Sequence, residues 1–160
     1  MSATASSGRR FPPAGGAGGV GLAVIQAAAV AGASRIVAIE PVPAKRRLAA
    51  ELGATDVLDP TVTDDLVRTV KDLTAGRGVD AAFEAAGRVD TTLAVSSGRN
   101  FTSAVYGSAD VDVDFPLLVR LAEAGRLNLE RLVSRRIGLS AADITAAFAD
   151  TEAVRTVIIP

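Results

Sequence analysis

The sequence predicts an α/β protein built on an incomplete, doubly wound parallel sheet. Strand-type and helix-type segments alternate between residues 20 and 84, and such alternation makes the helices crossovers between parallel strands. A glycine-rich turn at residues 16–21 comes directly before the first helix-type segment. Pro12 and Pro13, which cannot donate ladder hydrogen bonds, stand where the first strand is expected, and the alternation fails after Gly87. We therefore expect a sheet whose first strand is degraded and from which a later strand is missing.

Composition places the chain among ordinary globular proteins. It has 160 residues, of which 49% are hydrophobic and 22% charged, and its net charge of −1 gives no reason to expect nucleic acid or a membrane surface as partner. The longest apolar run, residues 20–33, is shorter than the roughly 20 residues that span a bilayer. Because Cys and His are absent, disulfides, thiol nucleophiles and imidazole bases are excluded, and zinc would have to be held by carboxylates alone. We expect a cytoplasmic protein that binds no metal ion.

The glycine turn has the spacing of a dinucleotide-binding loop. Gly16, Gly18 and Gly21 form the pattern G-x-G-x-x-G, an apolar helix-length run follows, and the next β-branched run ends on Glu40. In a Rossmann-like fold the first glycine allows a tight turn, the second lets N–H groups approach a pyrophosphate, and the third lets helix and strand pack closely. The helix N-terminus faces the phosphates, and the acid accepts hydrogen bonds from a ribose diol. The pattern therefore predicts a dinucleotide site.

Local signals predict the elements of the first half. Pro43 suits the first turn of a helix and Gly53 its end, while Thr61 or Thr63 is a candidate cap for the following helix. In chain order we expect a helix at 20–31, a strand at 35–40, a helix at 43–52, a strand at 56–58, a helix that buries Leu66, Val70 and Leu73, and a strand at 79–84.

The second half has similar elements without the regular rhythm. Asp114 is a candidate cap for a helix that ends at Gly125, and Ser140 with Asp143 resembles a capping box. In chain order we expect a short helix at 89–95, a polar stretch at 96–100, a strand at 101–106, the capped helix, a turn and short strand within 129–137, a helix that carries Ile144, Ala147 and Phe148, and a final strand at 154–159.

From Gly16 to Ile159 the sequence resembles the C-terminal portion of the medium-chain, zinc-type alcohol dehydrogenases. The matching blocks are GAGGVG at 16–21, Glu40 with Lys45, ELGATD at 51–56, GVD at 78–80, FEAAG at 83–87, YGSA at 106–109, DFP at 114–116 and AGRL at 124–127. The resemblance implies that the main chain of residues 18–20 carries the pyrophosphate, that Glu40 holds the adenosine ribose and that Lys45 lies beside it. The predicted cofactor-binding residues are Gly16, Gly18, Gly19, Val20, Gly21, Glu40 and Lys45.

Glu40 also bears on the choice of cofactor. A carboxylate at this position repels a 2′-phosphate, which favours NAD over NADP. The nearby cations Lys45, Arg46 and Arg47 keep NADP open, because such side chains bind phosphate. The same cations are equally explained as the solvated face of a helix.

Three departures from the family pattern limit the activity that the resemblance implies. The N-terminal catalytic domain with its cysteine and histidine zinc ligands is missing, Pro12 and Pro13 replace the first strand, and a block between Leu93 and Asn100 is lost. The final strand belongs in the family to the missing domain. We divide the chain into a mobile tail with a broken first strand (1–13), a Rossmann-like dinucleotide-binding domain (14–153) and a strand whose usual partner is absent (154–160). No catalytic residue is expected, and we interpret Glu84, near a strand end, as a cap or polar rim residue.

Several hypotheses remain open. The first is a shortened dehydrogenase that binds NAD or ADP-ribose at most and does not oxidise alcohols alone. The second is a non-catalytic nucleotide-binding or assembly module that associates with itself or with a full-length paralogue through exposed apolar surfaces. The third is a decayed gene product, unstable because its sheet edges are unpaired. A class I methyltransferase, which also has an acid after its second strand, and a twin-arginine export signal at Arg9 and Arg10 are the remaining alternatives.

Overall fold

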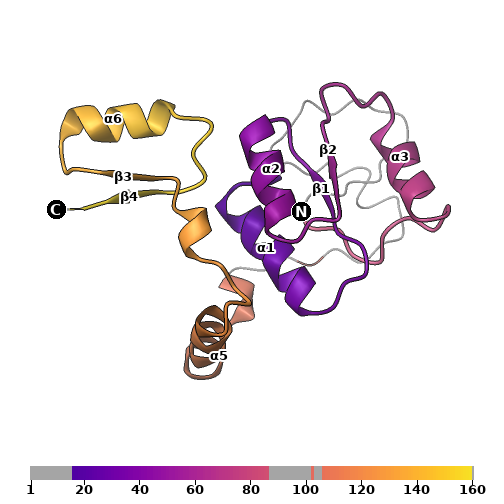
Figure 1. Cartoon of the computed structure of the whole chain (residues 1–160), viewed down its shortest axis with the longest axis horizontal. Coiled ribbons are helices and arrows are strands. Elements are labelled where there is room, and N and C mark those ends of the chain that lie inside the picture. Colours follow the sequence, from indigo (N-terminus) through magenta and orange to yellow (C-terminus); the bar gives the residue numbers. More distant parts are fainter. Residues whose placement is uncertain (1–15, 87–101, 103–105, 160) are drawn as a thin grey trace.

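The computed structural model describes residues 16–86, 102 and 106–159 (Figure 1). Its first half is an alternation of helices and strands, as the sequence predicts. The elements are α1 (Gly19–Val30), β1 (Val37–Ile39), α2 (Pro43–Glu51), β2 (Asp56–Leu58) and α3 (Leu66–Leu73). β1 and β2 pair in parallel, with Val37 opposite Asp56 and Ile39 opposite Leu58. α2 is the crossover between them, so the predicted parallel arrangement is confirmed for this pair.

The core of the first half lies between β1, α1 and α2. Every residue of β1 is buried, as in a strand covered on both faces. α1 contributes the fully buried Leu22 and Ile25, and α2 contributes Ala49. Val20, in contrast, is 66% exposed, so this apolar helix is not buried on all its faces. The outer face of α1 consists mostly of alanines, whose exposure costs little because their apolar area is small.

The turn residues around α2 and α3 test the predicted helix boundaries. α2 begins at Pro43 and ends before Gly53, whose φ of +118° only glycine adopts readily, so both predicted boundaries are confirmed. For α3 the predicted threonine caps are wrong, because Asp65 accepts the capping hydrogen bond at 2.9 Å. The reason lies upstream: Asp59 Oδ1 accepts hydrogen bonds from the N–H and the hydroxyl of Thr61, which holds this stretch in a turn.

The predicted strand at 79–84 is wrong. Residues 79–85 are irregular, and Phe83 is 44% exposed. In the doubly wound order this strand would pair with the one before the glycine loop, where Pro12 and Pro13 cannot donate to a ladder. Several other predicted features lie outside the described residues: the tail and prolines of 1–13, the helix at 89–95, the polar stretch at 96–100 and most of the strand at 101–106. Of that strand, Tyr106 belongs to the 3₁₀ turn η1 (Tyr106–Ser108).

The second half contains a smaller parallel unit. Its elements are α5 (Val111–Glu123), the 3₁₀ turn η2 (Glu130–Leu132), β3 (Arg135–Ile137), α6 (Ala141–Ala149) and β4 (Thr156–Ile158). β3 and β4 pair in parallel, with Arg135 opposite Thr156, and α6 connects them. The Ser140 hydroxyl accepts a hydrogen bond from the Asp143 N–H at 3.1 Å, which confirms the predicted capping pair of α6. The closing strand therefore finds a partner within the chain.

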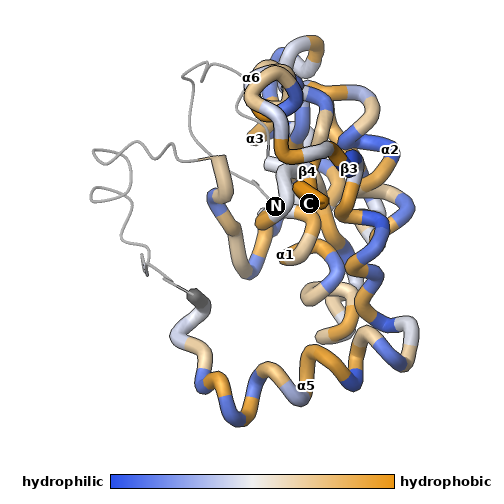
Figure 2. Tube along the Cα trace, turned by 90° about the vertical axis from the view of Figure 1, so that its left-hand side faces the viewer, coloured by the Kyte–Doolittle hydropathy of each residue, from blue (hydrophilic) through white to orange (hydrophobic). Residues whose placement is uncertain are grey.

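α5 begins earlier than predicted. Asp110 is its N-cap and accepts from the N–H of Asp112 at 3.1 Å, while Asp114 Oδ2 accepts from the Asp110 N–H at 2.8 Å. Asp114 is thus the reciprocal partner of the cap and not the cap itself, and Pro116 lies inside the helix. No side chain of α5 is buried, and Figure 2 shows the helix apart from the packed elements. Neither α5 nor any other described helix is long and apolar enough to cross a membrane.

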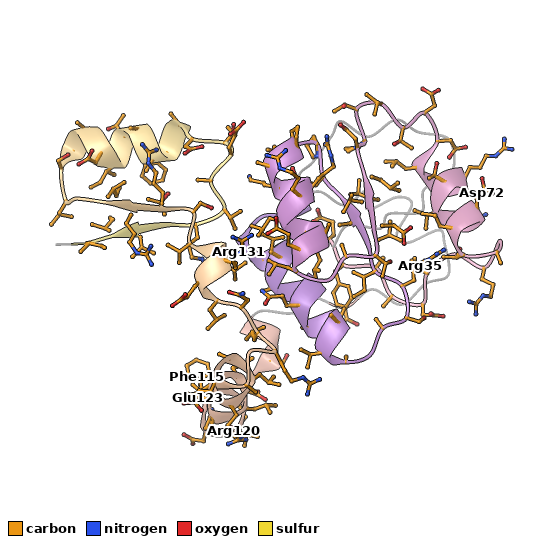
Figure 3. All side chains as sticks on the ribbon, viewed as in Figure 1. Arg35, Asp72, Phe115, Arg120, Glu123 and Arg131 are labelled. Atoms are coloured by element: carbon orange, nitrogen blue, oxygen red, sulfur yellow. The ribbon has the colours of Figure 1, made fainter. Side chains whose placement is uncertain are left out.

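A shared core and polar contacts join the two halves. Leu132 of η2 is 2% exposed and belongs to the same buried cluster as the apolar side chains of α1. Gln26 of α1 is also buried, and its Oε1 accepts a hydrogen bond from the Asn128 N–H at 2.5 Å. Arg131 forms an ion pair with Glu51 of α2 and lies between the halves in Figure 3. These contacts hold the segment before β3 against α1 and α2.

Candidate functional site

The predicted glycine loop leads into α1 and lies beside the C-terminal end of β1, the strand that follows α1 in the chain. The Gly16 N–H donates to the Ile39 carbonyl at 3.2 Å, which fixes the loop beside β1. Gly18 is the N-cap of α1, and its carbonyl accepts the first intrahelical hydrogen bond, from the Leu22 N–H at 2.9 Å. The N–H groups of residues 19–21 precede that bond and form the positive end of the helix dipole. The first turn of α1 has no acidic side chain to neutralise it.

Open space borders this loop at its middle glycine. A Cβ built on Gly18 would meet no atom within 4 Å, so a ligand can approach the main chain closely there. Gly16 and Gly21 are buried, whereas Val20 is exposed. The structure thus places the five predicted loop residues in one continuous segment that is partly buried and partly exposed. They are Gly16, Gly18, Gly19, Val20 and Gly21.

An arginine from the other end of the chain lies over the loop. A Cβ added at Gly19 would lie 3.2 Å from Nη2 of Arg155 and 3.8 Å from its guanidinium carbon. A guanidinium presents five N–H donors in a planar arrangement that matches phosphate oxygens. Sequence reasoning missed Arg155 because it stands in the apolar closing segment. The sequence feature that could have pointed to Arg155 is that it is the single charged residue between Val154 and Ile159.

Glu40 lies beneath the loop at the end of β1. Its Oε2 accepts a hydrogen bond from the Ala17 N–H at 2.8 Å, and its Oε1 accepts one from the Val42 N–H at 2.9 Å. The side chain is 0% exposed. The structure therefore places the predicted ribose acceptor next to the glycine loop, with both carboxylate oxygens bonded to main-chain donors.

Lys45 connects α2 to the C-terminal half. Its Nζ donates to the Thr151 carbonyl at 2.7 Å. Beside it, Asp150 accepts from the N–H groups of Ala153 and Glu152 at 3.0 and 2.9 Å. These two hydrogen bonds hold the pKa of Asp150 below its usual value, and nearby cations act in the same direction. Lys45 thus helps to fix the segment that leads to the arginine over the loop.

Arg46 is bound to main-chain and carboxylate oxygens near the end of β1. It donates from Nη1 to the carbonyls of Glu40 and Pro41 at 2.8 and 2.6 Å. The same nitrogen is 2.9 Å from Oδ2 of Asp59. Hydrogen bonds from the Thr61 hydroxyl and N–H are the main reason that the pKa of Asp59 lies below its usual value, and the charge of Arg46 adds to this. Arg46 therefore stabilises the turn after β1.

Glu84 makes a local contact, and the acidic side chains form no metal site in the described part of the chain. Glu84 Oε1 accepts a hydrogen bond from the Ala86 N–H at 2.7 Å, a local contact within the irregular stretch at 79–85 and its end. The donor set does not fit zinc, since the sequence has no Cys or His. Within the part of the chain that the structure describes, no three acidic side chains lie close enough together to hold a metal ion.

Comparison with known proteins gives a consistent set of relatives. The sequence pattern of zinc-binding dehydrogenases matches residues 19–127. An S-(hydroxymethyl)glutathione dehydrogenase from Synechocystis sp. is 30% identical over 176 residues, which covers 89% of this chain and 47% of that enzyme. Because this alignment is longer than the whole chain, it contains gaps on the side of this chain, as a lost internal block requires.

Solved structures give the same result for the fold. An alcohol dehydrogenase from Thermus sp. ATN1 has a TM-score of 0.69 at 27% identity, over 93% of this chain and 52% of that enzyme. A protein from Sinorhizobium meliloti, described as a zinc-binding dehydrogenase and bound to NADP, has a TM-score of 0.62 at 24% identity, over 94% of this chain and 54% of its own. The chain spans about half the length of these relatives.

Proposed function

Because this chain belongs to the zinc-binding dehydrogenases, the medium-chain, zinc-type alcohol dehydrogenases, we propose that it binds a dinucleotide at residues 16–21. The observation that supports this most directly is the guanidinium of Arg155 above Gly19, at the positive end of α1. Main-chain N–H groups and an arginine that converge beside open space suit the two phosphates of a dinucleotide.

Each part of the site has a task in this proposal. The N–H groups of residues 19–21 and the guanidinium of Arg155 hold the pyrophosphate, and Gly18 leaves room for it. Glu40 accepts from the ribose hydroxyls through the second lone pair of each carboxylate oxygen, once the ribose gains access to this buried group. Lys45 stays on the protein side and fixes the C-terminal segment. When bound, the dinucleotide supplies the hydride acceptor of dehydrogenase chemistry.

We propose that NAD is preferred over NADP. Glu40 places negative charge where a 2′-phosphate would lie. Arg46 is bound through Nη1 to two carbonyls and Asp59, and Lys45 is bound to the Thr151 carbonyl, so both are engaged by acceptors of the protein itself. Arg47 is exposed and is the cation through which NADP remains a competitor.

Alcohol oxidation by this chain alone is not part of the proposal. The family reaction relies on a zinc ion that polarises the alcohol oxygen, and the donors of this chain do not fit zinc. Within the described residues the site has groups that hold phosphate and ribose. We therefore propose similar affinities for NAD and ADP-ribose, since the two share the adenosine half and the pyrophosphate.

A second candidate, an assembly module, is favoured by the surface of α5. Phe115 is 57% exposed and Leu118 45% exposed, and apolar groups of this size are usually covered. In this hypothesis the chain is cytoplasmic and associates with itself or with a full-length paralogue. Analytical ultracentrifugation of the pure chain, with and without the paralogue, tests it. Sedimentation as a monomer in both samples argues against it.

Calorimetric titration with NAD and with ADP-ribose tests the binding proposal. We expect both to bind with similar affinity, and the change Arg155→Leu to weaken each by roughly tenfold, the order expected for a lost charge-assisted hydrogen bond. Arg120→Leu, a matched change on α5 in the lower part of Figure 3, should leave both affinities within about twofold. Absence of binding to both ligands would refute the proposal.

A further inference from the structure

The carboxylate of Glu40 joins three segments of the first half. Glu40 directly follows β1, its Oε2 is bonded to Ala17 in the glycine loop, and its Oε1 is bonded to Val42, the N-cap of α2. All three segments are therefore linked through two oxygens of one side chain. A hydrogen bond with a charged acceptor is roughly twice as strong as a neutral one, so this junction is a strong link.

The glycine loop depends on this link. Ala17 is 1% exposed and belongs to the buried core, so its N–H needs an acceptor inside the protein. The second hold on the loop is the hydrogen bond from Gly16 to the Ile39 carbonyl, and Ile39 is the residue directly before Glu40. These two attachments of the loop therefore go to the last residue of β1 and to the residue that follows it.

We propose that Glu40 is a positioning residue for the phosphate subsite, and not simply a ribose acceptor. By holding Ala17, its carboxylate fixes the loop so that the N–H groups of residues 19–21 point together toward the open space beside Gly18. The inference rests on the proposed phosphate binding at this loop. It adds that Glu40 supports the binding of an anion that has no ribose for the carboxylate to contact.

Replacing Glu40 by glutamine separates the two roles. The amide has nearly the same shape, but one of its ends is an NH₂ donor, which cannot accept from a main-chain N–H. Glu40→Gln therefore loses at least one of the two attachments and keeps an oxygen that a ribose hydroxyl can use. Glu123→Gln, the same chemical change on the exposed surface of α5, is the matched control.

Inorganic pyrophosphate is the probe, because it carries the phosphates without the ribose. Its affinity is measured by NMR titration of the full chain, well below the unfolding temperature of each variant. We expect Glu40→Gln to weaken pyrophosphate binding by about tenfold or more, the order expected for a lost hydrogen bond to a charged group, and Glu123→Gln to change it by less than about twofold. A purely structural role would lower the unfolding temperature but leave the affinity of the folded chain unchanged, and that result overturns the inference.

The outcomes distinguish this inference from the proposed function. If the wild-type chain binds NAD and pyrophosphate and Glu40→Gln binds pyrophosphate equally well, the inference is wrong and the proposed function stands. If the wild-type chain binds neither, the proposed function fails and the inference fails with it. If Glu40→Gln does not fold, the inference is tested by NMR spectroscopy of the wild-type chain. A through-hydrogen-bond coupling between the Ala17 amide nitrogen and the Glu40 carboxyl carbon supports the inference, and its absence overturns it.

Discussion

Replacing Leu132 by alanine tests whether the two halves of the molecule share one core. Leu132 is 2% exposed and lies in the same cluster as Leu22 and Ile25, more than a hundred positions earlier in the chain. The change removes three buried carbons and leaves a cavity beside α1, because the helix cannot collapse onto a turn that is also held by polar contacts. Buried Leu→Ala changes cost about 2–5 kcal/mol, and we expect about 3 kcal/mol here.

Urea unfolding of the pure chain, followed by far-UV circular dichroism, measures this loss. Leu139→Ala is the matched control, since Leu139 lies in the same half and is 72% exposed, and we expect a change within about 0.5 kcal/mol. We expect a single cooperative transition for the wild-type chain and for both variants, and observing it would also count against a decayed, unstable product. Equal small shifts for the two variants, or two separate transitions, would refute the shared core.

Three further predictions follow from single residues. Gly53→Ala should lower the free energy of unfolding by more than about 1 kcal/mol, because φ is +118° and the new Cβ would lie 3.0 Å from the Ala29 Cβ; unchanged thermal unfolding would contradict this. Gly18→Ala should change stability by less than about 1 kcal/mol, since its Cβ meets open space, yet weaken NAD binding in calorimetry because that Cβ occupies the proposed phosphate space. Asp150 has a folded-state pKa below its ordinary value of 3.8, so its ionised form adds stability above that pH and loses it as the pH falls through the lowered pKa. The stability difference between the wild-type chain and Asp150→Asn should therefore shrink as acid unfolding is carried to pH values below the lowered pKa, and a difference that does not shrink with falling pH argues against this role.

The glycine loop and the elements around it could be predicted because their signals are local. Gly53 marks a backbone position that few other residues fill, and Pro43 fixes the first turn of a helix. The position of Glu40 at the end of β1 followed from its spacing to the glycines. Its two main-chain hydrogen bonds did not, because they depend on how the loop and the start of α2 fold over the strand.

Features that depend on distant partners were wrong or missed. The segment at 79–84 has strand-forming residues, but a strand requires a paired neighbour, and local composition does not report whether one exists. Arg155 is separated from Gly19 by nearly the whole chain, so no local pattern links the two. The cap of α5 is Asp110 and not Asp114, because Asp110 accepts from the N–H of Asp112 while Asp114 accepts from the N–H of Asp110.

The position of Arg155 over Gly19 has a consequence for synthesis on the ribosome. The glycine loop emerges first, and the guanidinium that completes the proposed phosphate subsite is made much later. A nascent chain that stops before β4 therefore has the helix N-terminus without its cation. Nucleotide capture would then have to wait until Arg155 has been synthesised, and only from that point does the chain gain the added stability that a bound ligand confers.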